Sequence, residues 1–194
     1  MWDECPDNVG FVWDKGDKTK TDAAFASAKH VVSHTFVINR VSPSAMEARG
    51  AVGDYNAADD HYTLYTPLQG AHPYRAAIAR LVKAPESKVR IVSGDVGGSF
   101  GSKRNYPEDL LLPELARRVG RPVRWIPPRS QDMTGLGHSR RQLQRITLGG
   151  RRDGTIEATR VEVVGDNGAF PVFGAGLARN AAIMSPGAYA IPSV

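Results

Sequence analysis

The chain has 194 residues, of which 41% are hydrophobic, so it is long enough to bury the core of one domain or slightly more. Lys and Arg exceed Asp and Glu by 25 to 20, but the basic residues are scattered and no aromatic ladder is interleaved with them, which argues against a nucleic-acid-binding surface. A single cysteine, Cys5, excludes a disulfide framework within the chain, and the lack of an export signal or of ~18 consecutive apolar residues predicts a cytoplasmic protein without a membrane span.

The first third of the chain predicts one helix and three strands. Residues 21–29 begin with a Thr-Asp pair that can cap a short helix. Residues 31–40 alternate apolar and polar side chains, as a strand does. Residues 51–55 and 61–66 are two β-type runs on either side of a polar segment, so we expect a hairpin there.

Helices and strands then follow one another in the middle of the chain. Residues 73–82 carry apolar side chains at helical spacing after a proline, and residues 89–92 are a short apolar run typical of a buried strand. Residues 107–119 predict a helix that ends at Gly120, although Pro113 inside it should remove a hydrogen bond or kink the helix.

The last third of the chain predicts strands only. Residues 122–126 favour a strand, and residues 142–148 and 155–164 favour a second hairpin around an Arg-Asp-Gly turn. The Gly- and Ala-rich remainder predicts no element. Because helices are mixed with hairpins rather than alternating regularly with strands, the expected fold class is α+β.

One segment, GDVGGSFGSK at residues 94–103, concentrates glycine around a single aromatic ring. It is not a phosphate-binding P-loop, because Arg104 stands where that motif needs Ser or Thr, and it lacks the G-x-G of a dinucleotide fingerprint. Glycine also allows positive φ and close approach of backbone N–H groups to a ligand. A plain flexible turn is the alternative, but a large apolar ring such as Phe100 is costly to expose in the middle of a turn and is more easily explained as the wall of a pocket.

Other catalytic and metal-binding patterns are absent from the sequence. Among the five histidines, only His30 and His34 have helical spacing, and they straddle the predicted boundary between a helix and a strand. There is no H-E-x-x-H and no G-x-S-x-G. We therefore expect neither a metal held by side chains nor a serine hydrolase.

The glycine segment and three other stretches resemble, in order, motifs of the molybdenum hydroxylases, the family of xanthine dehydrogenase, aldehyde oxidase and aerobic carbon monoxide dehydrogenase. SAMEARG at residues 44–50 is similar to the family's P-M-E-P-R-G, and LYTPLQGAH at residues 64–72 to its strand ending in T-x-x-Q. DVGGSFGSK at residues 95–103 is similar to D-x-G-G-G-F-G-x-K, and GRPVRW at residues 120–125 to G-R-P-V-[KR]-W.

This resemblance implies a fragment of the large, molybdopterin-binding subunit of such an enzyme. The cofactor would be molybdenum bound to molybdopterin, in its cytosine dinucleotide form, and the reaction the oxidation of an aldehyde, an N-heterocycle or carbon monoxide with oxygen from water. Electrons would pass to [2Fe-2S] clusters and FAD on a small and a medium partner subunit, in a dimer of heterotrimers. Residues 1–20 would be a linker from a preceding domain, and residues 21–194 the first molybdopterin-binding domain, incomplete at its C-terminus.

The resemblance also assigns residues to the site. Gln69 would hydrogen-bond near the molybdenum or the pterin, Phe100 would line the substrate channel, and backbone would approach the cofactor at four further positions. Those positions are Gly97, Gly98, Ser99 and Gly101. Three alternatives stay open from the residues themselves: Gln69 caps the following helix, Glu47 pairs with Arg49, and Lys103 either binds a cofactor phosphate or lies in solvent.

The sequence departs from the family's pattern at several positions. Ser99 replaces a usual glycine, Ala45 and Ala48 replace prolines, and Arg104 stands where members that bind purines have an acidic residue. The family's general-base glutamate would lie beyond Val194, so the fragment alone is expected to be inactive. A non-catalytic relic or assembly module that keeps the fold without the cofactor is the competing interpretation.

Overall fold

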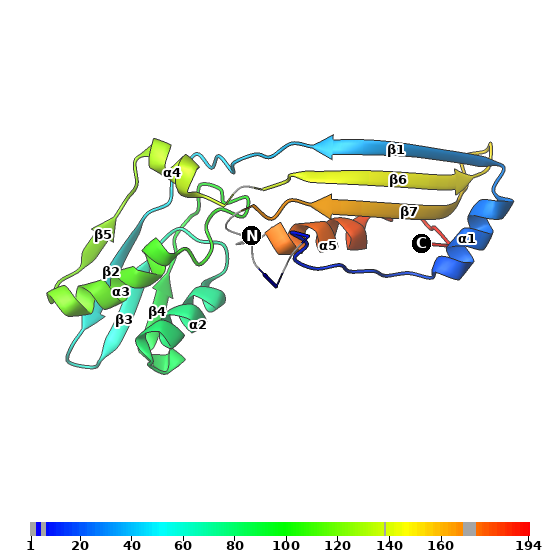
Figure 1. The fold of residues 1–194 in the computed structure, drawn as a ribbon. Coiled ribbons are helices and arrows are strands. Elements are labelled where there is room, and N and C mark those ends of the chain that lie inside the picture. Colours follow the sequence, from blue (N-terminus) through cyan, green and yellow to red (C-terminus); the bar gives the residue numbers. More distant parts are fainter. Residues whose placement is uncertain (1–2, 5–6, 138, 169–173) are drawn as a thin grey trace. The chain divides into compact units, whose positions relative to one another are not determined.

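The computed structural model describes residues 3–4, 7–137, 139–168 and 174–194 (Figure 1). The chain forms two compact units, residues 42–136 and residues 1–41 with 137–194. Both contain helices and sheet, so the predicted α+β class is confirmed. Cys5 lies outside the described residues. None of the helices in the described part of the chain is long and apolar enough to cross a bilayer.

The unit of residues 42–136 is built on a four-stranded sheet in the order β4-β3-β2-β5. Its strands are β2 (Ala51–Asn56), β3 (His61–Tyr65), β4 (Val89–Val92) and β5 (Val123–Trp125). β2 and β3 form the predicted hairpin, β5 pairs antiparallel with β2, and β4 pairs parallel with β3. The parallel pair needs a crossover, which α2 (Ala71–Val82) and the 3-10 turn η1 (Glu86–Lys88) provide.

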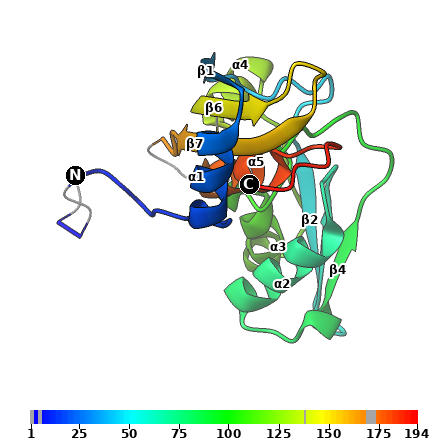
Figure 2. The same ribbon diagram turned by 90° about the vertical axis from the view of Figure 1, so that its right-hand side faces the viewer.

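Two helices, α2 and α3 (Pro107–Val119), cover one face of this sheet (Figure 2). The hydrophobic core between these helices and the sheet includes Leu64 and Ile78, both fully buried. α3 begins with Pro107 and ends at Gly120, whose φ of +67° is left-handed, as is common where a helix stops. Pro113 lies inside α3 and is fully buried. The short helix α4 (Arg129–Gly135) follows two prolines and was not predicted.

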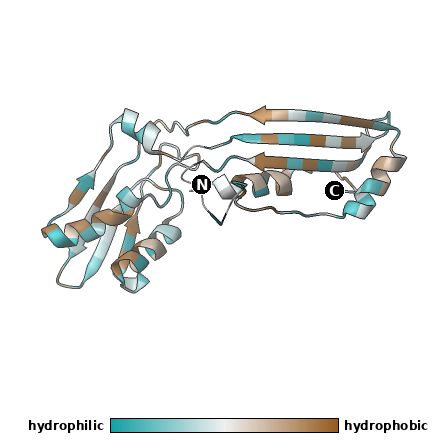
Figure 3. Ribbon diagram, viewed as in Figure 1, coloured by the Kyte–Doolittle hydropathy of each residue, from teal (hydrophilic) through white to brown (hydrophobic). Residues whose placement is uncertain are grey.

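The other unit contains a three-stranded antiparallel sheet in the order β1-β6-β7. Its strands are β1 (His30–Ile38), β6 (Gln142–Gly150) and β7 (Ile156–Gly165), and Figure 3 shows hydrophobic and hydrophilic residues alternating along β6. The helices α1 (Lys18–Ser27) and α5 (Gly174–Met184) both contact β7 (Figures 1 and 2). β6 and β7 pair antiparallel on either side of a turn that contains Gly154 at a φ of +92°, so the second predicted hairpin is confirmed.

The N-terminal helix starts earlier than the sequence pattern suggested. Asp17 caps α1, and its Oδ1 accepts a hydrogen bond from the Lys20 N–H at 2.9 Å. The predicted cap at Thr21 and Asp22 is therefore wrong: Thr21 is buried within the helix, and the Asp17 side chain satisfies one of the free N–H groups of the first turn instead. Helix α5 was not predicted either, since its sequence is rich in Gly and Ala and carries no clear start or stop signal.

Candidate functional site

The glycine segment leaves β4 and makes a tight turn with an unusual backbone. We call residues 97–103 the glycine turn. Gly98, Phe100 and Gly101 have φ values of +92°, +52° and +93°. The Ser102 N–H donates to the Ser99 carbonyl at 2.8 Å, so the two central residues of a β-turn both have positive φ, as in type I′ turns. A phenylalanine in this conformation is strained, and such strain is concentrated at functional sites.

Glu47 binds both ends of this turn. Its Oε2 accepts the Gly97 N–H at 2.9 Å and the Lys103 ammonium at 2.5 Å, while its own N–H donates to the Gly97 carbonyl at 3.3 Å. The Lys103 side chain is only 1% exposed, whereas that of Glu47 is 40% exposed. The hydrogen bond from Lys103 holds the pKa of the Glu47 carboxyl below its usual range.

Gln69 binds the middle of the turn from the end of the next motif. Its Oε1 accepts the Ser99 hydroxyl at 2.8 Å and the Gly101 N–H at 3.1 Å, and its backbone N–H donates to the Lys103 carbonyl at 3.0 Å. The structure therefore brings Gln69 together with the glycine segment, although the two lie some 30 residues apart in sequence.

Between these anchors, three successive amides are left without a partner. Among the described residues, the N–H groups of Gly98, Ser99 and Phe100 have no hydrogen-bond acceptor. Phe100 is 65% exposed, and its ring lies against Gly98, where an added Cβ would come 2.9 Å from the ring. Two of these three residues, Gly98 and Phe100, have positive φ. A run of free N–H groups in such a turn suits an anionic or oxygen-rich group, so the residues present fit a molybdopterin cofactor.

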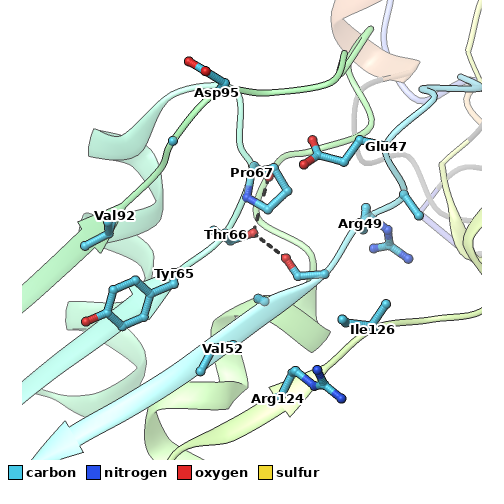
Figure 4. A pocket seen from close by; sticks show the side chains of 14 residues that line it. Glu47, Arg49, Val52, Tyr65, Thr66, Pro67, Val92, Asp95, Arg124 and Ile126 are labelled. Carbon is cyan, nitrogen blue, oxygen red and sulfur yellow. Dashed lines mark hydrogen bonds between the residues drawn. The ribbon is translucent and has the colours of Figure 1, made fainter.

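A groove of about 550 Å³ adjoins the start of the turn (Figure 4). Val52, Tyr65 and Val92 line it from three neighbouring strands, in register with one another. Two lining residues are joined by a hydrogen bond, because the Thr66 hydroxyl donates to the Gly50 carbonyl at 3.1 Å, drawn as a dashed line in Figure 4. All four motif-like stretches contribute to the lining. Their contributions are Glu47 to Gly50, Tyr65 to Pro67, Asp95 and Arg124.

Arg49 is held in a buried cluster beside this groove. Its side chain is 3% exposed, its Nε lies 3.0 Å from Asp132, and its guanidinium lies 4.2 Å from the centre of the Tyr106 ring and 5.3 Å from that of Trp125. The expected Glu47–Arg49 pair is wrong, because each side chain reaches a better-buried partner elsewhere. Cation–π contact and a buried carboxylate stabilise Arg49, which fixes the strand entry at Gly50.

Asp109 is a second buried acid in the same unit. It is 2% exposed, and its Oδ2 accepts the Tyr74 hydroxyl at 3.1 Å while Oδ1 has no partner in the described part of the chain. Burial raises the pKa of Asp109 to about 6, opposed by the positive charge of Arg49 and the Tyr74 hydrogen bond.

Two further alternatives from the sequence are corrected. Gln69 does not cap α2, since Gly70 occupies the cap position without a side-chain hydrogen bond and the Gln69 amide binds the turn instead. Lys103 neither lies in solvent nor is available to a phosphate, because it is buried against Glu47. The Glu47–Lys103 pair spans 56 residues, and no local pattern could have revealed it. Among the described residues, no cluster of His, Cys, Asp and Glu could hold a metal ion.

Comparison with known proteins places these features in context. Residues 1–194 match the family described as molybdopterin cofactor-binding domain. The carbon monoxide dehydrogenase large chain of Hydrogenophaga pseudoflava is 38% identical over 82% of this chain and 20% of that protein. The nicotine 6-hydroxylase large subunit of Paenarthrobacter nicotinovorans is 30% identical over 98% of this chain and 24% of that protein. The chain thus spans about a fifth of the length of these relatives.

Solved structures show the same similarity. Carbon monoxide dehydrogenase from Oligotropha carboxidovorans matches 78% of this chain and 19% of its own with a TM-score of 0.70 and 30% identity. Quinoline 2-oxidoreductase from Pseudomonas putida 86 matches 73% of this chain and 18% of its own with a TM-score of 0.65 and 36% identity.

Proposed function

Because the chain belongs to the molybdopterin cofactor-binding domain family, we propose that its glycine turn and Gln69 form one wall of the molybdenum-cofactor site of a hydroxylase large subunit. The observation that carries this proposal is the turn itself. It is anchored at both ends and in the middle, yet its N–H groups at Gly98, Ser99 and Phe100 have no acceptor among the described residues.

Each residue of the turn has a distinct part in the proposal. Gly98 and Gly101 allow backbone to approach the cofactor where an L side chain would be strained. Gly97 has no room for a side chain, since an added Cβ would lie 2.6 Å from Cβ of Glu47. The exposed Phe100 ring shields one side of the site from water and lines the substrate channel. Gln69 orients the cofactor by hydrogen bonding.

The bound cofactor would supply the hydroxylation of a carbon centre with oxygen derived from water, and the protein would supply binding and orientation. For the whole protein we propose oxidation of an aldehyde, an N-heterocycle or carbon monoxide, which the names of its relatives support. Its partners would be an FAD-binding medium subunit and a [2Fe-2S] small subunit, in a cytoplasmic dimer of heterotrimers, with molybdopterin cytosine dinucleotide as the cofactor.

The test is the molybdenum content of the longest natural product of the gene, purified from its own cells, together with the nucleotide released by hydrolysis. We expect about one molybdenum per chain and released CMP. A purified protein without metal would instead support the relic or assembly module, for which the serine at position 99 is the sequence feature in favour.

A further inference from the structure

The Ser99 hydroxyl takes part in a hydrogen-bond chain whose direction is fixed. The Lys103 N–H can only donate, and it donates to the Ser99 Oγ at 3.1 Å. The Ser99 hydroxyl hydrogen is therefore directed to Gln69, 2.8 Å away. The Gly101 N–H, also an obligatory donor, lies 3.1 Å from the same Gln69 atom. That atom must be the carboxamide oxygen, because two donors converge on it.

The remaining end of the carboxamide then points away from the turn. Gln69 is exposed, and its NH2 group has no partner among the residues that the structure describes. With glycine at position 99, as in the family's motif, only the Gly101 N–H would hold the oxygen, and an amide held by one bond rotates more easily than one held by two.

We propose that Ser99 is a positioning residue that locks the Gln69 carboxamide, with its oxygen against the glycine turn and its NH2 group toward the bound ligand. The site wall then presents a fixed hydrogen-bond donor to an oxygen acceptor, such as an oxo, carbonyl or phosphate oxygen. The lock is a property of the protein alone, and only the nature of its ligand rests on the proposed function.

The first test is hydrogen–deuterium exchange at the Gly101 amide of the full chain. Ser99→Ala should raise this exchange about fivefold, as expected for the loss of one net hydrogen bond from the network, and Ser99→Thr should restore it because the hydroxyl is kept. Ser93→Ala, at an exposed serine directly before the glycine segment, is the matched control and should leave exchange at Gly101 unchanged.

A double-mutant cycle separates positioning from independent binding. If Ser99 acts through Gln69, Ser99→Ala should add nothing to exchange at Gly101, or to molybdenum loss, once Gln69→Ala is present. Additive effects, or an unchanged Gly101 exchange in Ser99→Ala, would overturn the lock. A wild-type protein without molybdenum would defeat the proposed function only, since exchange at Gly101 still decides for or against the lock.

Discussion

At the scale of single residues, Glu47 shows how one carboxylate stabilises the site. It neutralises the ammonium group of Lys103, which is 1% exposed, and it accepts the N–H of Gly97 at the other end of the turn. Removing the partner of a buried cation strongly destabilises a protein, whereas exposed ion pairs contribute little to its stability.

Glu47→Gln should therefore lower the free energy of unfolding by about 2 kcal/mol, since the pair is half open to water and its loss costs less than that of a fully buried one. The matched control is Glu86→Gln, which breaks the exposed pair with Arg75 and should change stability by less than about 0.5 kcal/mol. Urea unfolding of both variants gives the comparison, and equal losses would contradict a special role for Glu47.

Asp109 and Glu47 make the stability of the folded state depend on pH in opposite directions. Because burial raises the pKa of Asp109 from 3.8 to about 6, the folded state binds its proton more tightly than the unfolded state does. Stability from this group is thus fully present below pH ~4 and is lost as the pH rises to ~6. Glu47, with a lowered pKa, contributes above its unfolded value of 4.5 and loses that contribution as the pH falls through its folded pKa.

Asp109→Asn should remove the loss of stability between pH ~4 and ~6, on the order of 2 kcal/mol, and should be at least as stable as the wild type at pH 7. Tyr74 can still donate to the amide oxygen in this variant. The urea midpoint measured across this pH range tests the prediction. A variant that keeps the wild-type pH profile would show that another group titrates.

At the scale of elements, α3 packs unusually close to β2. A Cβ added to Gly53 would lie 2.3 Å from the Leu112 carbonyl carbon and 2.5 Å from the Pro113 nitrogen, so the strand touches helix backbone. Pro113, which the sequence marked as a defect, lies at this contact. Pro113 has no N–H to donate within the helix, and its backbone nitrogen instead lies in the close contact between α3 and β2.

Gly53→Ala should consequently destabilise the unit of residues 42–136 by about 3 kcal/mol, since helix backbone cannot yield as a flexible side chain would. Gly94→Ala is the control, because an added Cβ there meets nothing within 4 Å. Thermal unfolding of both proteins measures the difference. If the two variants melt together, the close approach of α3 to β2 is not what stabilises this unit.

The elements that the sequence predicted well were those with complete local signals. The helix at 107–119 has proline at its start and glycine at its end, and the strand at 89–92 is a short apolar run. Helices α4 and α5 lack such signals, because one is short and the other is rich in small residues. Their formation depends on tertiary contacts, which local propensity does not report.

The candidate site, too, could be predicted from the sequence only in part. Resemblance to known motifs was enough to select Gln69 and the glycine turn, and the structure places them in direct contact. The pairing of Glu47 with Lys103, and of Arg49 with Asp132, could not be predicted, since each joins residues more than fifty positions apart. The short separation of Glu47 and Arg49 in the sequence suggested an ion pair between them, which the structure does not have.

At the scale of the whole molecule, the groove and the glycine turn both lie within residues 42–136. The β6–β7 hairpin, by contrast, belongs to the other unit. A change in that hairpin should therefore affect stability without affecting the cofactor, and this difference allows backbone strain to be separated from cofactor binding.

The most direct test compares Gly101→Ala with Gly154→Ala. The two glycines have nearly the same φ, +93° and +92°, and an added Cβ meets nothing within 4 Å at either, so each alanine should cost about 1 kcal/mol of backbone strain. The measurement is molybdenum per chain after purification. We predict about a tenfold loss in Gly101→Ala and full retention in Gly154→Ala; equal molybdenum in the two proteins would contradict a cofactor held at the glycine turn.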